Sequence, residues 1–334
     1  MRKSAKDEQI LSPAALHPKY FSKAADAVAE LQLLYQAATK FLYDAFSEAL
    51  KAPRENTRYR AFYPEIRITT TGFGKIDTRL SFGHVAEPGT YSTTVTRPDL
   101  FANYLTQQIA LLIENHNVEV AIGVSSTPIP LHFAVLTDPN LNIPQEAALT
   151  FPLRDMFDVP DLGGIHDEIV NSFGFKHPDG SGPLAPFTAE RIDYSLARLA
   201  HYTATDPVYF QNHVLFTNYQ FYIDEFIAYA RAMLADPNSG YTALVGPGNQ
   251  VLMTAEAELT HPAKMPQMPS YHLTRKDNAG ISLVNIGVGP SNAKTATDHI
   301  AVLRPHAWLM VGHCAGLRNT QALGDYVLAH AYLR

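Results

Sequence analysis

The chain has 334 residues, enough for about two domains that each have their own core. Hydrophobic residues make up 46% of it and charged residues 17%, which excludes a disordered protein, and the net charge of −6 argues against the basic surface that nucleic-acid binding requires. The single cysteine, Cys314, excludes an internal disulfide and a zinc site built from several cysteines.

Targeting and membrane signals are not recognisable in the sequence. The N-terminus begins with the basic stretch MRKSAK, but the apolar run of a signal peptide does not follow it. No stretch approaches the roughly 18 apolar residues that a membrane span needs. We therefore expect a soluble cytoplasmic protein that has neither a nucleic acid nor a membrane as its partner.

The first half of the chain is predicted to mix helices with strands. Apolar residues at three- and four-residue spacing predict a helix over residues 22–50, capped by Ser22, and a second helix begins at Pro98. Alternating and β-branched stretches predict strands within residues 58–72, 89–98, 118–125 and 132–138. The segment 171–187 (NSFGFKHPDGSGPLAPF) is dense in glycine and proline, so we place a boundary there, between domains 1–180 and 190–334.

The second half is more regular. Residues 191–203 are helical or mixed, and a helix within 216–234 has Phe221, Phe226, Tyr229 and Met233 broadly on one side. Three apolar strands then run into glycine turns, at residues 241–249, 281–293 and 306–317. Short apolar strands that alternate with helices indicate an α/β fold with a mostly parallel sheet, in which ligands bind beyond the carboxyl ends of the strands.

The turn in LVNIGVGPSNAKTATDHI (residues 283–300) does not fit the two common phosphate-binding motifs. A dinucleotide fingerprint needs a third glycine where Asn292 stands and an acid about 20 residues on, near Leu309. A P-loop needs a second glycine, and Lys294 comes one residue early. Gly287 and Gly289 still allow the backbone to approach a ligand closely.

The residues after this turn have two interpretations. Pro290 favours the first turn of a helix, and Ser291 and Asn292 are good capping residues. Their side chains could instead face a ribose or a phosphate. From the turn alone, a tight strand–helix connection and a nucleotide site remain equally open.

The combination of motifs is more specific. VNIGVGPSNAKT, HIAVLRP, WLMVGHCAGLR and GDYVLAHAYLR, with AEPGTYSTTVTRPDLF and FTNYQFYIDEF upstream, resemble the AMP nucleosidase family over most of the chain. More distantly they are similar to the nucleoside phosphorylase and nucleosidase superfamily. The resemblance implies an N-terminal α+β regulatory domain, followed by a phosphorylase-like α/β domain with a mixed, mostly parallel sheet that is incomplete here.

The resemblance also implies an activity. Members hydrolyse AMP to adenine and ribose 5-phosphate without a cofactor for the chemistry, are activated by MgATP, are inhibited by phosphate, and assemble as homo-hexamers. The superfamily's phosphate-binding arginines fall here on Leu252 and Met310, and its serine falls on His313. Because a phosphate nucleophile would lose its strongest charge-assisted bonds, these differences favour water as the nucleophile.

His313 is the candidate catalytic residue: it either orients the water or contacts the ribose phosphate, unless it merely completes a turn. Cys314 lacks a paired base and is expected to line the adenine pocket, and Arg318 either binds the 5′-phosphate or is an ordinary surface charge. The expected substrate-binding residues are Gly248, Asn249, Gly287, Gly289, Ser291, Asn292, Cys314, Ala315, Gly316 and Arg318. No histidine pattern has metal-ligand spacing, so no metal is expected.

Three questions remain open at this point. Arg67, Arg79 and Arg97 could bind the phosphates of ATP or phosphate as effectors, although ordinary surface charge is favoured. The purine-protonating acid of the superfamily is expected beyond Arg334, so we expect the 334-residue chain alone to have little activity. The alternatives to an AMP hydrolase are a non-catalytic nucleotide-binding regulatory protein and a purine nucleoside phosphorylase.

Overall fold

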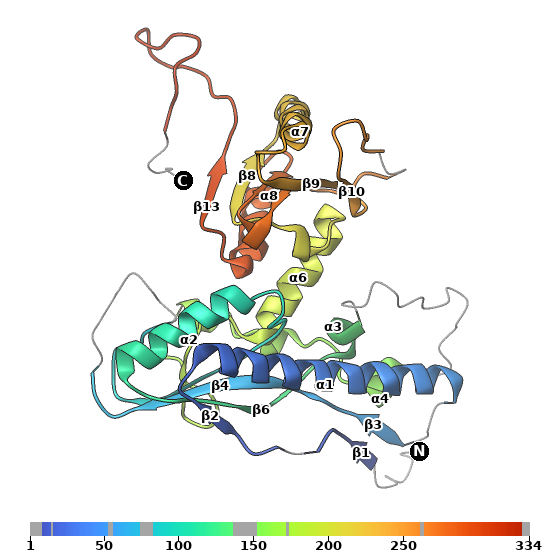
Figure 1. Cartoon of the computed structure of the whole chain (residues 1–334), viewed down its shortest axis with the longest axis vertical. Coiled ribbons are helices and arrows are strands. Elements are labelled where there is room, and N and C mark those ends of the chain that lie inside the picture. Colours follow the sequence, from blue (N-terminus) through green and yellow to red (C-terminus); the bar gives the residue numbers. More distant parts are fainter. Residues whose placement is uncertain are drawn as a thin grey trace. The chain divides into compact units, whose positions relative to one another are not determined.

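The chain divides into two compact units, Met1–Ala197 (the N-terminal unit) and Arg198–Arg334 (the C-terminal unit) (Figure 1). The computed structural model describes residues 9–14, 16–52, 56–73, 83–135, 152–171, 174–260 and 264–328. The division falls within helix α6 (Ala189–Thr203), beyond the glycine- and proline-rich segment in which the sequence suggests a boundary.

The N-terminal unit is built on a five-stranded sheet. Its helices are α1 (Ala24–Lys51), α2 (Ala102–His116), α3 (Leu131–Val135), α4 (Leu153–Met156), α5 (Glu168–Asn171) and the first part of α6, with a 3-10 turn at Leu162–Gly164. Its strands are β1 (Gln9–Leu11), β2 (Lys19–Phe21), β3 (Thr57–Tyr59), β4 (Phe62–Thr70), β5 (Gly89–Thr94), β6 (Val120–Pro128) and β7 (Gly182–Pro183). The sheet order is β2-β6-β4-β5-β7, antiparallel except between β5 and β7, while β1 and β3 form a separate parallel pair.

Helix α1 supplies one side of the core and confirms the predicted amphipathic helix. Its face of Tyr35, Leu42 and Phe46 packs on Tyr63 and Phe157. The Phe46 and Phe157 rings meet edge to face with centroids 6.1 Å apart, a geometry that aromatic pairs favour.

Two local predictions in this unit are wrong. Ser22 does not cap α1, because the residue before the helix is Lys23 and it makes no side-chain capping bond. The strand predicted at 132–138 begins instead as α3, and residues 136–138 lie outside the described ranges. Proline favours the start of a helix because its φ is fixed, and the Pro130 carbonyl accepts from the N–H groups of Phe133 (3.0 Å) and Ala134 (3.3 Å), which closes a first helical turn.

A buried carboxyl group holds α6 in the N-terminal unit. Asp193 is 5% exposed and accepts hydrogen bonds from the Tyr63 hydroxyl (2.6 Å) and the Thr96 hydroxyl (2.7 Å). The Thr96 hydroxyl lies 3.2 Å from that of Tyr35. Burial raises the pKa of Asp193 to about 7, although the bonds from Tyr63 and Thr96 lower it. One acid therefore links α1, β4, the end of β5 and α6.

We expect Asp193→Asn to change how stability depends on pH. Between pH 4 and 7 the folded state keeps a proton on Asp193 that the unfolded state has lost, so this group's stabilising contribution falls as pH rises. Urea unfolding at pH 5 and pH 7.5 measures the effect: the wild-type protein should lose more stability across this interval than the variant. Asp26→Asn, an exposed change on α1, serves as the control, and equal slopes for wild type and Asp193→Asn would contradict the expectation.

The C-terminal unit is an α/β layer structure. Its strands are β8 (His213–Thr217), β9 (Tyr241–Gly246), β10 (Gln250–Leu252), β11 (Ser270–Arg275), β12 (Ile281–Asn285) and β13 (Ala307–Met310). Its helices are the end of α6, α7 (Gln220–Ala235) and α8 (Pro290–Ile300), with 3-10 turns at Pro207–Tyr209, Lys276–Asn278 and Ala301–Leu303. The sheet order is β10-β9-β11-β12-β8-β13.

The α/β fold and the mixed sheet are confirmed, but the sheet is not mostly parallel. Only β12-β8-β13 are parallel neighbours, and the other three pairs are antiparallel. The connections explain this, because β9 meets β10 through residues 247–249 and β11 meets β12 through 276–280. Links this short join antiparallel strands, whereas a parallel link needs a crossover of a dozen residues or more.

Helices α7 and α8 cover opposite faces of this sheet. The residues of α7 that meet the sheet are Ile223, Phe226 and Ala230, against Leu244, Leu273 and Leu283. Those of α8 are Ala296 and Ile300, against Val214, Phe216 and Val284. The predicted apolar side of α7 is therefore only partly right: Phe226 is buried, but Phe221 (59%) and Tyr229 (45%) are exposed.

Candidate functional site

The ends of three parallel strands bring distant segments of the C-terminal unit together. Beyond the formal strands, Ile286 N–H donates to the Thr217 carbonyl (2.9 Å) and Val311 N–H to the Phe216 carbonyl (2.8 Å). After these bonds the backbone leaves the sheet in three segments, residues 217–219, 286–289 and 311–313. We call these three segments together the carboxyl edge. Ligands of α/β sheets bind in this position.

The 286–289 segment is a glycine-dependent strand–helix turn. Gly287 (φ 63°) donates its N–H to Asn285 Oδ1 (3.0 Å), and Gly289 (φ 113°) precedes α8 as its N-cap residue. Such φ values strain any residue other than glycine. Asn292 Nδ2 donates to the Val288 carbonyl at 3.4 Å, so this amide braces the turn, while Ser291 is exposed.

Two helix N-termini meet the carboxyl edge. α8 begins directly after Gly289, and α7 begins directly after Tyr219, on the opposite face of the sheet. The first N–H groups of a helix have no partner within the helix, and the helix dipole adds positive potential there. The carboxyl edge therefore favours the binding of an anionic group such as a phosphate ester.

His313 is held by residues of the first turn of α7. Its Nε2 lies 3.2 Å from the Tyr222 hydroxyl, and its ring lies 4.7 Å from that of Tyr219 at 69°. Thus the third glycine segment meets the segment after β8, as the parallel order β12-β8-β13 requires.

Sequence reasoning missed the residues of this α7 segment. The segment TNYQFY follows a buried strand and contains Asn218, Tyr219 and Tyr222, but it has no glycine. It therefore did not resemble the glycine-rich turns that bind phosphate groups. The available signal was a run of polar and aromatic residues between a strand and a helix. That signal gains meaning only when β8 is known to lie between β12 and β13.

The Gly248–Asn249 turn differs from the predicted strand–turn–helix plan. It closes the β9–β10 hairpin, and β11 separates β9 from β12. Gly248 (φ 80°) donates its N–H to the Ala204 carbonyl (2.7 Å), and Asn249 Oδ1 accepts from Asp206 N–H (2.7 Å). Both residues therefore already make contacts within the protein.

We expect Asn249→Ala to reduce stability rather than substrate affinity. The substitution removes the acceptor for Asp206 N–H and places alanine at φ 56°, which together cost about 1–2 kcal/mol. Asn249→Asp keeps the acceptor and tolerates the conformation, so it should retain most of the stability. Thermal unfolding measures the effect on stability. Unchanged stability together with weaker binding of AMP, the substrate that the resemblance implies, would instead support the substrate-binding prediction.

The residues after His313 are exposed in an irregular segment. These are Cys314, Ala315, Gly316 and Arg318. The backbone N–H of Arg318 donates to Gln321 Oε1 (3.0 Å), which forms a local turn. Their assignment to the adenine pocket and the 5′-phosphate stays a prediction.

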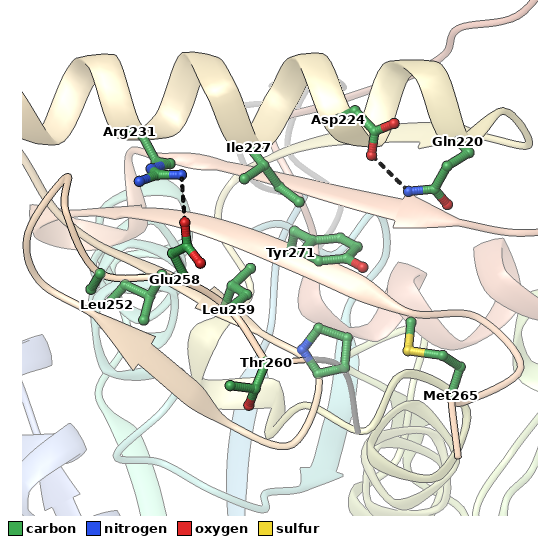
Figure 2. Close-up of a pocket in the computed structure, with 12 residues that line it drawn as sticks. Gln220, Asp224, Ile227, Arg231, Leu252, Glu258, Leu259, Thr260, Met265 and Tyr271 are labelled. Carbon is green, nitrogen blue, oxygen red and sulfur yellow. Dashed lines mark hydrogen bonds and ion pairs between the residues drawn. The ribbon is translucent and has the colours of Figure 1, made fainter. Parts of the chain in front are cut away.

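A cavity of about 240 Å³ lies between α7 and the segment that follows β10 (Figure 2). Figure 2 shows Arg231 directed at Glu258, with Nη1 4.0 Å from Oε1, and Gln220 bonded to Asp224 at 2.8 Å. Leu252, at the expected arginine position, lines the same cavity. With one arginine among its lining residues and two carboxylates near it, the cavity is a poor site for a phosphate dianion.

The arginines of the N-terminal unit that were candidates for effector phosphates lie beside carboxylates. Arg67 contacts Glu65 (2.9 Å) and Asp179 (2.6 Å), and Arg97 contacts Asp99 (3.0 Å). Hydrogen bonds from Ser181 and then Arg67 hold the pKa of Asp179 well below its usual range. Two carboxylates thus offset the charge of Arg67. Arg79 lies outside the described residues.

Among the residues that the structure describes, no three His, Cys, Asp or Glu side chains gather as a metal-binding group. None of the described helices combines the length and apolar character needed to cross a bilayer.

Comparison with known proteins shows which proteins this chain is related to. Residues 26–181 match the family described as bacterial AMP nucleoside phosphorylase N-terminus. Over 322 residues the chain is 42% identical to AMP nucleosidase of Escherichia coli strain K12 and to that of Escherichia coli O157:H7. The chain is related to the AMP nucleosidases. This confirms the family resemblance seen in the turn motifs.

The extent of these matches differs. The alignment to each Escherichia coli AMP nucleosidase covers 93% of this chain and 65% of the relative, so the chain spans just under two thirds of the length of the relatives. A solved AMP nucleosidase from Bacteroides thetaiotaomicron VPI-5482 matches at 23% identity, over 40% of this chain and 45% of that one, with a TM-score of 0.28. That structural similarity is too low to support an argument.

Proposed function

We propose that the protein carrying this chain hydrolyses the N-glycosidic bond of AMP, releasing adenine and ribose 5-phosphate. The observation that carries the proposal is the 42% identity to AMP nucleosidase over 93% of the chain. In the reaction, an oxygen of water bonds to C1′ while the C1′–N9 bond breaks and its electron pair leaves with the purine. The transition state is oxocarbenium-like, as for other glycosides.

The carboxyl edge offers groups suited to this chemistry. The N-termini of α7 and α8 favour the 5′-phosphate, and Gly287 and Gly289 let it approach the backbone. His313, which contacts the Tyr222 hydroxyl, offers an imidazole nitrogen to the attacking water. Binding energy at the phosphate then serves the reacting C1′ atom.

The test is product analysis with the full-length protein. AMP is incubated with the enzyme in buffers with and without phosphate, and the products are separated by chromatography. We expect adenine and ribose 5-phosphate in both buffers. Release that depends on phosphate, with ribose 1,5-bisphosphate as product, would identify a phosphorylase, and calorimetric binding of AMP without turnover would identify a non-catalytic binding protein.

We also propose that MgATP activates and phosphate inhibits the enzyme, that it forms a homo-hexamer, and that it works in the cytoplasm. These properties rest on the resemblance to the AMP nucleosidases. Because Arg67 and Arg97 lie beside carboxylates, Arg67→Ala should leave activation by MgATP intact. Initial rates with and without MgATP, and light scattering for the mass, test the two points.

A further inference from the structure

Asn218 occupies the first position after the central strand of the parallel part of the sheet. The preceding residue, Thr217, is fully buried, and its hydroxyl accepts from Tyr219 N–H (3.2 Å). Backbone pairing on both sides of β8 ends at Phe216 and Thr217, where Val311 and Ile286 donate to the carbonyls. The Asn218 side chain thus starts where the neighbouring strands turn away.

The side-chain oxygen of Asn218 lacks a hydrogen-bond partner. Its Oδ1 is buried and, among the residues that the structure describes, nothing donates to it. An unsatisfied buried acceptor costs about 1–3 kcal/mol, so such a group in a folded protein calls for an explanation. A donor from outside the chain would satisfy it.

Gly312 lies beside this oxygen and places no side chain against it. A Cβ atom at position 312 would lie 3.8 Å from Asn218 Oδ1 and 3.8 Å from Tyr219 Cε2. Any side chain there would therefore pack against the unpartnered oxygen. With glycine, no side chain at position 312 covers the oxygen on the side where His313 follows.

His313 supplies a second acceptor in the same neighbourhood. Its ring contacts Tyr219, the residue after Asn218, and its Nε2 is engaged with the Tyr222 hydroxyl. When Nε2–H donates to that hydroxyl, the neutral ring presents Nδ1 as an acceptor. The carboxyl edge then offers two acceptors, an amide oxygen and an imidazole nitrogen.

Two acceptors select a ligand that has two protons to donate. The 5′-phosphate dianion of AMP and the ring nitrogens of its adenine bring acceptors only, so they cannot satisfy Asn218 Oδ1. A water molecule brings two protons, and when both are donated its lone pair points away from the protein. Ribose hydroxyls and the adenine amino group are the other donors in AMP.

We propose that Asn218 Oδ1 and His313 Nδ1 hold the attacking water between them, an assignment that rests on the proposed hydrolysis. The water oxygen forms a bond to C1′ as the C1′–N9 bond breaks. The electron pair of the broken C1′–N9 bond goes to adenine. One proton of the water passes to His313 Nδ1, and the other stays on the new C1′ hydroxyl, with Asn218 directing it. Adenine takes a proton from solvent, and His313 returns one to solvent.

The first test compares Asn218→Ala with Asn218→Asp in the full-length protein. Asn218→Ala should lower kcat for AMP by about 10-fold or more, with little change in KM, because it removes a group that acts on the nucleophile. Asn218→Asp keeps an acceptor oxygen and should recover much of the loss. Asn238→Ala, an exposed asparagine between α7 and β9, is the matched control and should behave like wild type. An unchanged kcat, or a raised KM alone, would overturn the proposal, the latter because it would place Asn218 on the ribose.

Two further readouts separate this proposal from the proposed function. With methanol present, Asn218→Ala should shift the ratio of methyl riboside 5-phosphate to ribose 5-phosphate relative to wild type, and an identical ratio would count against water positioning. A high-resolution crystal structure of the protein without AMP should show a water bonded to Asn218 Oδ1. If no electron density for a water is seen at Asn218 Oδ1, the assignment is wrong even if the enzyme hydrolyses AMP. If wild type releases no adenine, the hydrolysis itself is wrong, whatever the density shows.

Discussion

Replacing His313 with alanine in the full-length protein is expected to lower kcat for the proposed AMP hydrolysis by about 100-fold or more, in the range typical of a lost general base. The reason is the position of the imidazole, fixed at the carboxyl edge by the Tyr222 hydroxyl (3.2 Å) and the Tyr219 ring. Adenine release at saturating AMP measures kcat. Because binding of the phosphate and the purine is left in place, KM should change much less than kcat.

Two variants make this result specific to His313. Tyr222→Phe keeps the aromatic contact but removes the hydroxyl that orients the ring, so its kcat should fall less than that of His313→Ala. His306→Ala removes an exposed histidine that precedes the same strand, β13, at the opposite edge of the sheet, and it should have wild-type activity. If His313→Ala and His306→Ala were equally active, His313 would only complete a turn.

Replacing His272 with leucine is expected to cost about 3 kcal/mol or more of the free energy of unfolding, since it breaks the hydrogen bonds between the imidazole and three buried hydroxyls. His272 is fully buried on β11. Its Nδ1 lies 2.8 Å from Ser282 Oγ, and its Nε2 lies 3.0 Å from Thr205 Oγ1 and 3.1 Å from Ser270 Oγ. Urea unfolding followed by circular dichroism measures the loss. Ser282→Ala breaks one of these bonds and the bond that Gln211 N–H donates to Ser282 Oγ (2.8 Å), and it should cost less.

The same histidine makes the C-terminal unit sensitive to acid. Burial lowers the pKa of His272 to about 3, so between pH 6.5 and pH 3 the unfolded chain binds a proton that the folded chain does not. The stability of the wild-type protein should therefore fall as the pH drops through this interval. His272→Leu should show a smaller fall, and parallel pH profiles would show that His272 is not the group responsible.

Local patterns in the sequence were sufficient for the long elements. Helix α1, of 28 residues, was predictable because its apolar repeat continues for far longer than a strand. The short run HFAV was assigned to a strand, since periodicity cannot separate a strand from one helical turn in so few residues. The helix-starting position of Pro130 was the overlooked signal.

The candidate site was predictable only in part, because sheet order brings its residues together. Gly287, Gly289 and His313 stand in recognisable turns, so the sequence pointed to them directly. Asn218 and Tyr222 join them because β12 and β13 pair with β8 on either side, which no local pattern encodes. The different outcome at Gly248 has the same cause. The sequence predicted that its turn leads into a helix, but the turn leads into β10, which pairs with β9 as a hairpin.

Strand β13 has a consequence for the behaviour of this chain in solution. It is outermost in the sheet order, and Trp308 (46%), Leu309 (55%) and Met310 (48%) expose apolar surface on both of its faces. Edge strands of this kind pair readily with strands of other molecules. Preparations of the chain should therefore self-associate as protein concentration rises, and because the attraction is hydrophobic, added salt should strengthen it rather than screen it.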